Sequence, residues 1–191
     1  MTALLTAPVA ESSKSVPPEL AALRESLQRT VKVSAKFTQT RHLAALHDVL
    51  TTQGALEYQN GGRLVWKTFP PSESELVLEG QRVTISYPGM GGTQDVDFSA
   101  EPGMGKVFET IRAVLQADLD HLRALFTVSI RRKEPLSLTL TPKTEQLSRT
   151  LGRIQLDFDH QLRLVHVHLD EPDGDSTDIV FRDHLIQTAP H

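Results

Sequence analysis

The chain contains no cysteine among its 191 residues. This absence excludes disulfide bonds, thiolate catalysis and cysteine-based zinc sites, but it is compatible with both the cytosol and the periplasm. Aromatic residues make up only 5% of the chain, with a single tryptophan, and no apolar run approaches the roughly 20 residues of a membrane-spanning helix. A hydrophobic content of 39% and a charged content of 23% are those of a folded soluble protein.

A basic excess is also missing, because 24 acidic residues outnumber 20 basic ones and give a formal net charge of −4. Proteins that bind nucleic acid or anionic membranes usually carry clustered positive charge, so we expect no nucleic-acid partner. The length suits one domain with a sizeable core. We expect residues 17–188 to form this domain as a monomer, and residues 1–16 to be a flexible leader or the remnant of a signal peptide.

Two different periods organise the chain. Pro17 and Pro18 suit the first turn of a helix, because a proline has no N–H to satisfy there, and an apolar stripe continues to Val31. From Val33 the pattern alternates between apolar and polar residues, which is typical of strands. We expect about nine antiparallel strands, which include residues 49–59, 63–68, 75–78, 82–87, 126–132, 136–141, 153–159, 162–169 and 177–186.

The middle of the chain interrupts this alternation. Residues 88–105 hold two prolines and five glycines without a periodic segment, and a loop of this length is usually functional or mobile, so we expect a flap. Residues 106–126 predict a helix that restarts at Asp118, and its apolar stripe contains Phe108, Ile111 and Leu115. Sequential hairpins build a single curved sheet, so the fold class is mainly β with short helices that bury their stripes on the concave face.

The single tryptophan, Trp66, lies in a predicted hairpin. Gly61 and Gly62 form its turn, because glycine tolerates the positive φ that hairpins need. Every second side chain of a strand faces the same way. We therefore expect one shared apolar face, formed by Leu56, Tyr58, Leu64, Trp66, Leu76, Leu78, Val83, Ile85, Tyr87, Leu138, Leu140 and Leu156. From the residues alone, a core packed against the helices explains this face better than a binding cavity does.

The order and spacing of these motifs resemble the periplasmic outer-membrane lipoprotein carrier family, which is LolA-like. The similarity runs from about residue 20 to residue 186. The positions that carry it are Phe37 and Gln39 in the first strand, Leu64, Trp66 and Pro70 after the hairpin turn, the turn at residues 77–80, and the pair Tyr87-Pro88. Each motif is weak alone, whereas their order is moderately specific.

The resemblance implies an unclosed antiparallel β-barrel with a helical lid, which carries lipoprotein or lipid acyl chains across the periplasm toward the outer membrane. It also implies an inner-membrane donor complex and an outer-membrane acceptor as partners, and no covalent chemistry, catalytic residue, metal or cofactor. It favours a cavity over a plain core. The implied lipid-binding residues are the apolar face described above together with Phe37, Phe108, Ile111 and Leu115.

Two departures from the family pattern point to a specialised member. Asn60-Gly61 stands where the family usually has an arginine–proline pair, whose arginine helps to fasten the lid. The chain also ends at His191 without the longer C-terminal extension of some carriers. A paralogue of the kind found beside pigment or polyene-lipid pathways is therefore as well supported as the housekeeping carrier.

Other readings of the sequence remain open. His166 and His168 alternate on a strand and share a face, with Asp170, Asp173 and Asp175 just beyond, so they could bind a metal. A solvated strand that runs into an acidic turn explains the same residues. The alternative functions are an accessory protein or enzyme that holds an apolar small molecule in the same open barrel, and a structural interaction domain with a filled core.

Overall fold

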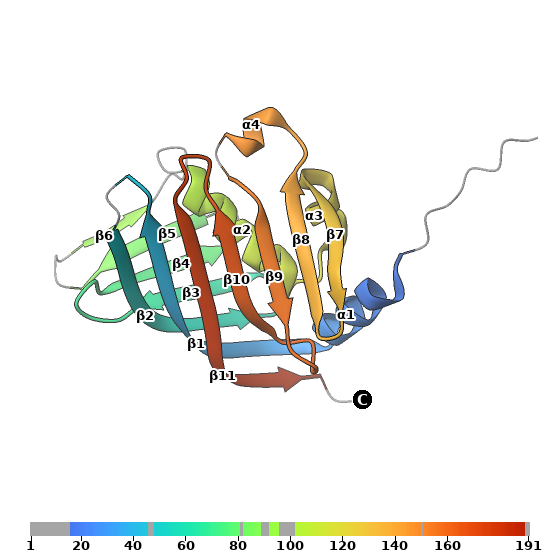
Figure 1. Ribbon diagram of the computed structural model, residues 1–191. Coiled ribbons are helices and arrows are strands. Elements are labelled where there is room, and N and C mark those ends of the chain that lie inside the picture. Colours follow the sequence, from blue (N-terminus) through green and yellow to red (C-terminus); the bar gives the residue numbers. More distant parts are fainter. Residues whose placement is uncertain are drawn as a thin grey trace, which may run out of the picture.

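Within the described residues, eleven strands form one antiparallel sheet in the order β6-β5-β4-β3-β2-β1-β11-β10-β9-β8-β7 (Figure 1). The computed structural model describes residues 16–45, 48–80, 82–88, 92–95, 102–149 and 151–189, so the expected leader lies outside them except for Val16. The strands are β1 (Thr30–Leu43), β2 (Asp48–Gln59), β3 (Arg63–Thr68), β4 (Ser74–Glu79), β5 (Arg82–Tyr87), β6 (Gly92–Asp95), β7 (Phe126–Lys133), β8 (Leu136–Pro142), β9 (Ile154–Phe158), β10 (Leu164–Asp170) and β11 (Ser176–Thr188).

The sheet consists of two meanders joined at the centre. Strands β1 to β6 follow one another across one half, β7 to β11 cross the other half, and β1 pairs with β11 to unite them. The edge strands β6 and β7 do not pair with each other in the described structure, so the sheet remains open. The expected curved antiparallel sheet, not closed into a barrel, is confirmed, although the expected number of about nine strands is too low.

Four short helices accompany the sheet: α1 (Pro18–Gln28), α2 (Pro102–Leu115), α3 (Leu119–Leu125) and α4 (Glu145–Ser148). Helices α2 and α3 lie on the concave side, between the two halves of the curved sheet (Figure 1). Asp118 separates the two helices, because its Oδ1 accepts a hydrogen bond from the backbone N–H of His121 at 3.0 Å and caps α3. The expected helical cover is confirmed, including its restart at Asp118.

The expectation for residues 88–105 is wrong in two places. Residues 92–95 form β6, which pairs with β5, and helix α2 begins at Pro102, before the expected start at residue 106. A short edge strand needs a neighbour to pair with rather than an apolar pattern of its own, so alternation did not reveal it. Pro102 carries a usable signal, because proline is favoured in the first turn of a helix. The rest of the expected flap lies outside the described residues.

Trp66 of β3 is the centre of an aromatic cluster that joins the sheet to helix α2. Its ring stacks on Phe37 of β1 at a centroid distance of 3.9 Å, and meets Phe108 of α2 edge-on at 5.3 Å. It also meets Phe181 of β11 edge-on at 6.1 Å. Such contacts add about 0.5–1.5 kcal/mol each beyond burial. One side chain therefore links both halves of the sheet to the covering helix.

Gly54 of β2 leaves the space that the Phe37 ring occupies. A Cβ atom at this position would lie 2.4 Å from Cζ of Phe37 and 2.0 Å from the carbonyl oxygen of Lys67. Glycine in a strand interior often marks such a close approach. The stacking of Phe37 on Trp66 therefore depends on the missing side chain at residue 54.

We predict that Gly54→Ala costs about 1–3 kcal/mol of unfolding free energy, as overpacked substitutions do, and shifts the fluorescence emission of Trp66. The added methyl group must displace Phe37, which stacks on the tryptophan. The matched control is Gly80→Ala, where φ is +60° and no atom lies within 4 Å of the new Cβ. This control should cost about 1–2 kcal/mol through backbone strain alone and leave the Trp66 emission unchanged. Equal spectra for both variants would contradict the proposed role of Gly54.

Candidate functional site

Antiparallel register aligns the apolar side chains of the concave face into continuous rows. One row crosses β2 to β5 through directly opposed residues, and it contains Leu56, Trp66, Leu76 and Ile85. A second row beside it contains Tyr58, Leu64, Leu78 and Val83. In the other half, a row runs through Leu138, Leu156, Val167 and Ile179. The alternation seen in the sequence thus becomes one apolar surface.

Most residues of the expected lipid-binding set are buried in one hydrophobic cluster. The buried members are Phe37, Leu56, Tyr58, Leu64, Trp66, Leu76, Leu78, Val83, Phe108, Ile111, Leu115, Leu138, Leu140 and Leu156. Ile85 is half-buried and packs against this cluster. Tyr87 departs from the expectation, because its side chain is 39% exposed at the end of β5, opposite Gly92, which offers no side chain to cover it.

Helices α2 and α3 fill much of the concave space in this structure. Phe108, Ile111 and Leu115 of α2 are all buried, and Leu119 and Leu122 of α3 join the same cluster. The side chains of the sheet therefore contact helix side chains over most of the face. Contact between these residues and a ligand stays a prediction.

A cavity of about 280 Å³ remains where the helices do not reach, and it is partly open to solvent. It lies between the end of α1, the start of β1, the β9–β10 turn and the end of β11. Buried apolar residues form its deep wall, namely Val33, Ala35, Leu56, Leu115 and Phe181. More exposed polar residues complete the lining, namely Arg29, Gln161, Arg163 and His184. The arrangement suits a molecule with an apolar tail and a polar end.

Only Leu56 and Leu115 of the expected set line this cavity. Sequence reasoning missed the β11 side, since a β-bulge there shifts the alternation. Ser34 of β1 pairs with Leu185 and Lys36 with Arg182, so one residue of β1 faces two of β11. Asp183 adopts a φ of +54° at this point. The bulge brings His184 to the concave side, one residue later than Asp183, which strict alternation from Phe181 would place there.

Two hairpin turns hold the C-terminal part of α2 against the sheet. Arg112 donates a hydrogen bond from Nη1 to the carbonyl oxygen of Gly80, in the β4–β5 turn. A Cβ at Gly62, in the β2–β3 turn, would lie 2.6 Å from Nε2 of Gln116, so the Gln116 side chain covers that glycine. Both glycines have positive φ. The helix therefore carries its own arginine contact to the sheet, although Asn60-Gly61 replaces the arginine–proline pair of the family.

The two histidines of the His-x-His strand lie on the convex face in a network with carboxylates. His166 approaches Asp157 through Nδ1 at 3.1 Å and Asp178 through Nε2 at 2.8 Å. His168 approaches Asp178 through Nδ1 at 2.9 Å and Asp170 through Nε2 at 3.2 Å. Each ring therefore has a carboxylate at both nitrogens. Because a carboxylate only accepts hydrogen bonds, two N–H donors on the His168 ring satisfy its two contacts best.

The network shifts the pKa values of its members in opposite directions. Partial burial lowers the pKa of His168, but the hydrogen bonds and charges of Asp178 and Asp170 outweigh this and raise it above its usual value. Burial raises the pKa of Asp178, but hydrogen bonds from His168 and His166 outweigh that effect and lower it. The charged forms of both partners are thus favoured in the folded state.

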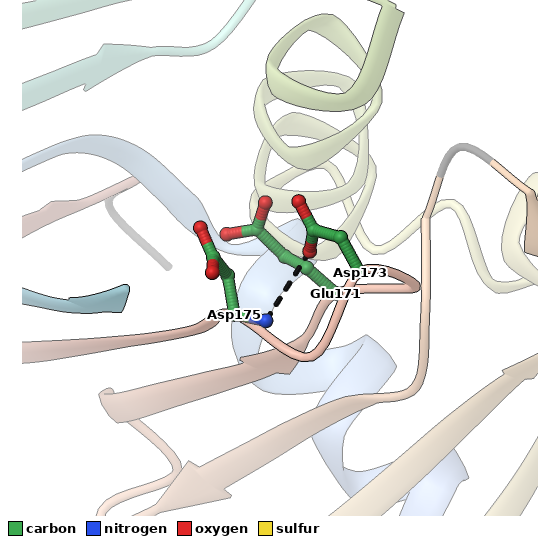
Figure 2. Close-up of side chains that lie close together, drawn as sticks. All are labelled: Glu171, Asp173 and Asp175. Carbon is green, nitrogen blue, oxygen red and sulfur yellow. Dashed lines mark hydrogen bonds between the residues drawn. The ribbon is translucent and has the colours of Figure 1, made fainter. Parts of the chain in front are cut away.

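The acidic turn after β10 brings three carboxylates together (Figure 2). Oxygens of Glu171, Asp173 and Asp175 lie within 4.8 Å of one another, which makes this the one group of three potential metal ligands among the described residues. Arg41 of β1 lies 3.2 Å from both Glu171 Oε2 and Asp175 Oδ2 through its Nη2. The backbone N–H of Ala44 donates to Asp175 Oδ1 at 2.9 Å. These contacts tie the turn to the end of β1 and partly neutralise its charge.

We predict that the convex-face network makes folding stability depend on pH. A raised pKa of His168 contributes stability that is present below about pH 6.5 and is lost as the pH rises through the folded-state value. The lowered pKa of Asp178 contributes above about pH 4 and is lost on acidification. Urea unfolding should therefore show stability falling from pH 6 to pH 8, by less than about 1 kcal/mol because the groups are partly solvated.

His168→Gln should flatten this decline, whereas His121→Gln, at an exposed position of α3, should not. A decline that persists unchanged in His168→Gln would assign the pH dependence to other groups.

None of the helices among the described residues is both long enough and apolar enough to span a bilayer.

Comparison with known proteins assigns the sequence to one family. The family described as "Outer membrane lipoprotein carrier protein LolA" matches residues 28–190. An outer-membrane lipoprotein carrier protein of Pseudomonas entomophila is 25% identical over 132 residues, which cover 66% of this chain and 59% of the relative. The chain thus spans less than two thirds of the length of that curated relative.

Solved structures share the architecture at low sequence identity. A DUF1329 family protein from Desulfovibrio piger aligns with a TM-score of 0.54 and 11% identity, over 91% of this chain and 92% of the other. A LolA superfamily protein from Nitrosomonas europaea aligns with a TM-score of 0.47 and 10% identity, over 90% and 94%. The family match extends over far more than half of the chain, and the open sheet with its helical cover agrees with it. The chain therefore belongs to the LolA family of outer membrane lipoprotein carrier proteins.

Proposed function

We propose that this protein is a carrier that reversibly holds a lipid or lipoprotein acyl chain between the concave face of the sheet and helix α2. The observation that carries the proposal is the apolar cavity of about 280 Å³, which continues into the buried rows of the concave face through Leu56, Leu115 and Phe181. Membership of the LolA family supports it, as does the carrier name of the Pseudomonas entomophila relative.

The finer parts of the proposal follow from the family. We propose that the protein acts in the periplasm, receives its cargo from a donor complex in the inner membrane and delivers it toward an outer-membrane acceptor. We propose further that it works by binding alone, without covalent chemistry. The two halves of the sheet present aliphatic and aromatic side chains to the deep wall of the cavity, and such a wall binds apolar groups without activating water.

The cavity is too small for a long acyl chain unless helix α2 moves. Ligand pockets usually measure about 300–1,000 Å³, so the present cavity accepts only a short apolar segment. A chain of about sixteen carbons would gain on the order of 12 kcal/mol by leaving water, but it needs space that Phe108, Ile111 and Leu115 now occupy. Helix α2 must therefore move away from the sheet when such a chain enters.

The volume also supports the alternative in which the same open barrel holds an apolar small molecule, as an accessory protein or an enzyme would. A compact ligand fits about 280 Å³ without displacement of α2. The two proposals differ in the response of the helix, because only a long acyl chain requires it to move.

We predict that Trp66 reports the cargo. Its ring touches Phe181, which lines the cavity, and Phe108 of the helix that must yield. Addition of a long-chain fatty acid or a diacyl lipopeptide should shift its emission to the blue or quench it. Trp66→Phe should lose the signal yet still bind radiolabelled ligand. Unaltered emission with several acyl ligands, at concentrations where the radiolabelled ligand binds, would refute the assignment.

We also predict that weakening the cover leaves binding intact or improves it. Phe108→Ala removes a buried contact with Trp66 and should cost about 2–5 kcal/mol of stability, while affinity for a long acyl chain stays equal or rises because the competing side chain is gone. Phe158→Ala, a core position of β9 outside the cavity, is the control and should cost similar stability without a gain in affinity.

Hydrogen exchange of residues 108–125 should be faster than that of β1 and β11 and should change on loading. Protection equal to that of the strands, indifferent to lipid, would exclude a mobile lid.

A further inference from the structure

We propose that the cavity selects single-chain amphiphiles with an anionic headgroup, a carboxylate or a phosphate, which Arg29 and Arg163 bind at the opening while the tail enters between Leu56, Leu115 and Phe181. The inference deepens the proposed carrier function and rests on it. It concerns the polar end of the ligand, which neither the apolar rows nor the covering helix can recognise.

The charges around the cavity are one-sided. Arg29, Arg163 and His184 contribute to its lining, together with the hydroxyl side chains of Ser26, Thr30 and Thr188 and the amide of Gln161. Among the described residues, the lining contains no aspartate or glutamate, although Asp159 pairs with Arg163 from outside it. The whole chain has the opposite balance, with 24 acidic and 20 basic residues. A wall that concentrates positive charge and hydrogen-bond donors in an acidic protein favours an anion.

The two arginines differ in how they are held. Asp159 orients Arg163, because its Oδ2 lies 2.6 Å from the guanidinium. Arg163 therefore offers an oriented hydrogen-bond donor, but the carboxylate partly neutralises its charge. The Arg29 side chain is exposed and makes no ion pair or hydrogen bond with another described residue. Its guanidinium is therefore available to a ligand, and its fork of donors matches carboxylate and phosphate oxygens.

His184 completes the polar edge of the opening. Its Nε2 lies 2.8 Å from the carbonyl oxygen of Leu164, which can only accept, so this nitrogen is the donor. The bond ties the ring of β11 to the start of β10, at the residue that follows Arg163. Polar groups thus occupy the solvent side of the cavity, and apolar groups occupy its depth.

The volume limits the tail. About 280 Å³ is slightly below the usual range for ligand pockets, so one short chain fits while α2 stays in place, and longer or additional chains require the helix to move. A ligand that reaches the cavity without moving α2 is therefore a single-chain anion such as a medium-chain fatty acid or an alkyl phosphate.

Isothermal titration calorimetry of the full chain with dodecanoate, dodecyl phosphate and dodecanol tests the proposal. All three probes carry an unbranched saturated tail, which in dodecanoate is shorter by one methylene than in the other two. They are used below the concentrations at which they aggregate, at low ionic strength because salt screens the charges. The variants are Arg29→Gln, Arg29→Lys and the control Arg63→Gln, which removes the same charge at an exposed position of β3 outside the cavity. Thermal melting verifies that each variant is folded.

We expect the wild-type chain to bind both anions more tightly than dodecanol. Arg29→Gln should weaken the anions roughly tenfold, the effect of one hydrogen bond to a charged group, and change dodecanol less than about twofold. Arg29→Lys should lose less, because the charge remains. Arg63→Gln should change nothing. If Arg29→Gln weakens the binding of only one of the two anions, that anion carries the preferred headgroup, carboxylate or phosphate, and the proposal is still supported.

Equal affinity for the three probes, with Arg29→Gln without effect, would overturn the headgroup proposal and leave the apolar carrier function standing. The absence of binding for all three, including dodecanol, would overturn both. A loss of anion binding of the same size in Arg63→Gln would also overturn the proposal, because the effect would then come from net charge rather than from the opening of the cavity.

Discussion

The pairing of β1 with β11 is the interaction on which the rest of the structure depends. It joins strands that are far apart in sequence, and it is the only link between the two meanders within the described sheet. Without it, each half would expose a hydrophobic face with nothing opposite, since α2 and α3 need both halves to cover. The long-range contact must also overcome the entropy of closing most of the chain into a loop.

The irregularity in this same pairing creates the candidate site. In a regular ladder between β1 and β11, strict alternation from Phe181 would place Asp183 rather than His184 on the concave side. The bulge at Asp183 instead turns the end of β11 and places His184 beside the cavity. The β1–β11 pairing and the cavity are therefore neighbours, and the cavity is bounded by the sheet and, at Leu115, by the end of α2.

The two faces of the sheet perform different physical roles. The concave face buries apolar rows, and Trp66 connects them to both halves and to α2. The convex face carries a hydrogen-bonded network of histidines and carboxylates that crosses β9, β10 and β11. The histidine pair that suggested a metal site in the sequence is instead explained by cross-strand partners, because His166 lies opposite Asp157 and His168 opposite Asp178.

The sequence by itself determined the strand segments, the restart of the helix at Asp118 and the apolar face that contains Trp66, because period and capping are local properties of the chain. The tertiary structure alone decided the strand order, the edge strand β6 and the exposure of Tyr87, since these depend on which segments become neighbours. It also decided the position of the cavity. Arg29, Arg163 and His184 come from three distant segments, and no local pattern records that a bulge in β11 brings them to one opening.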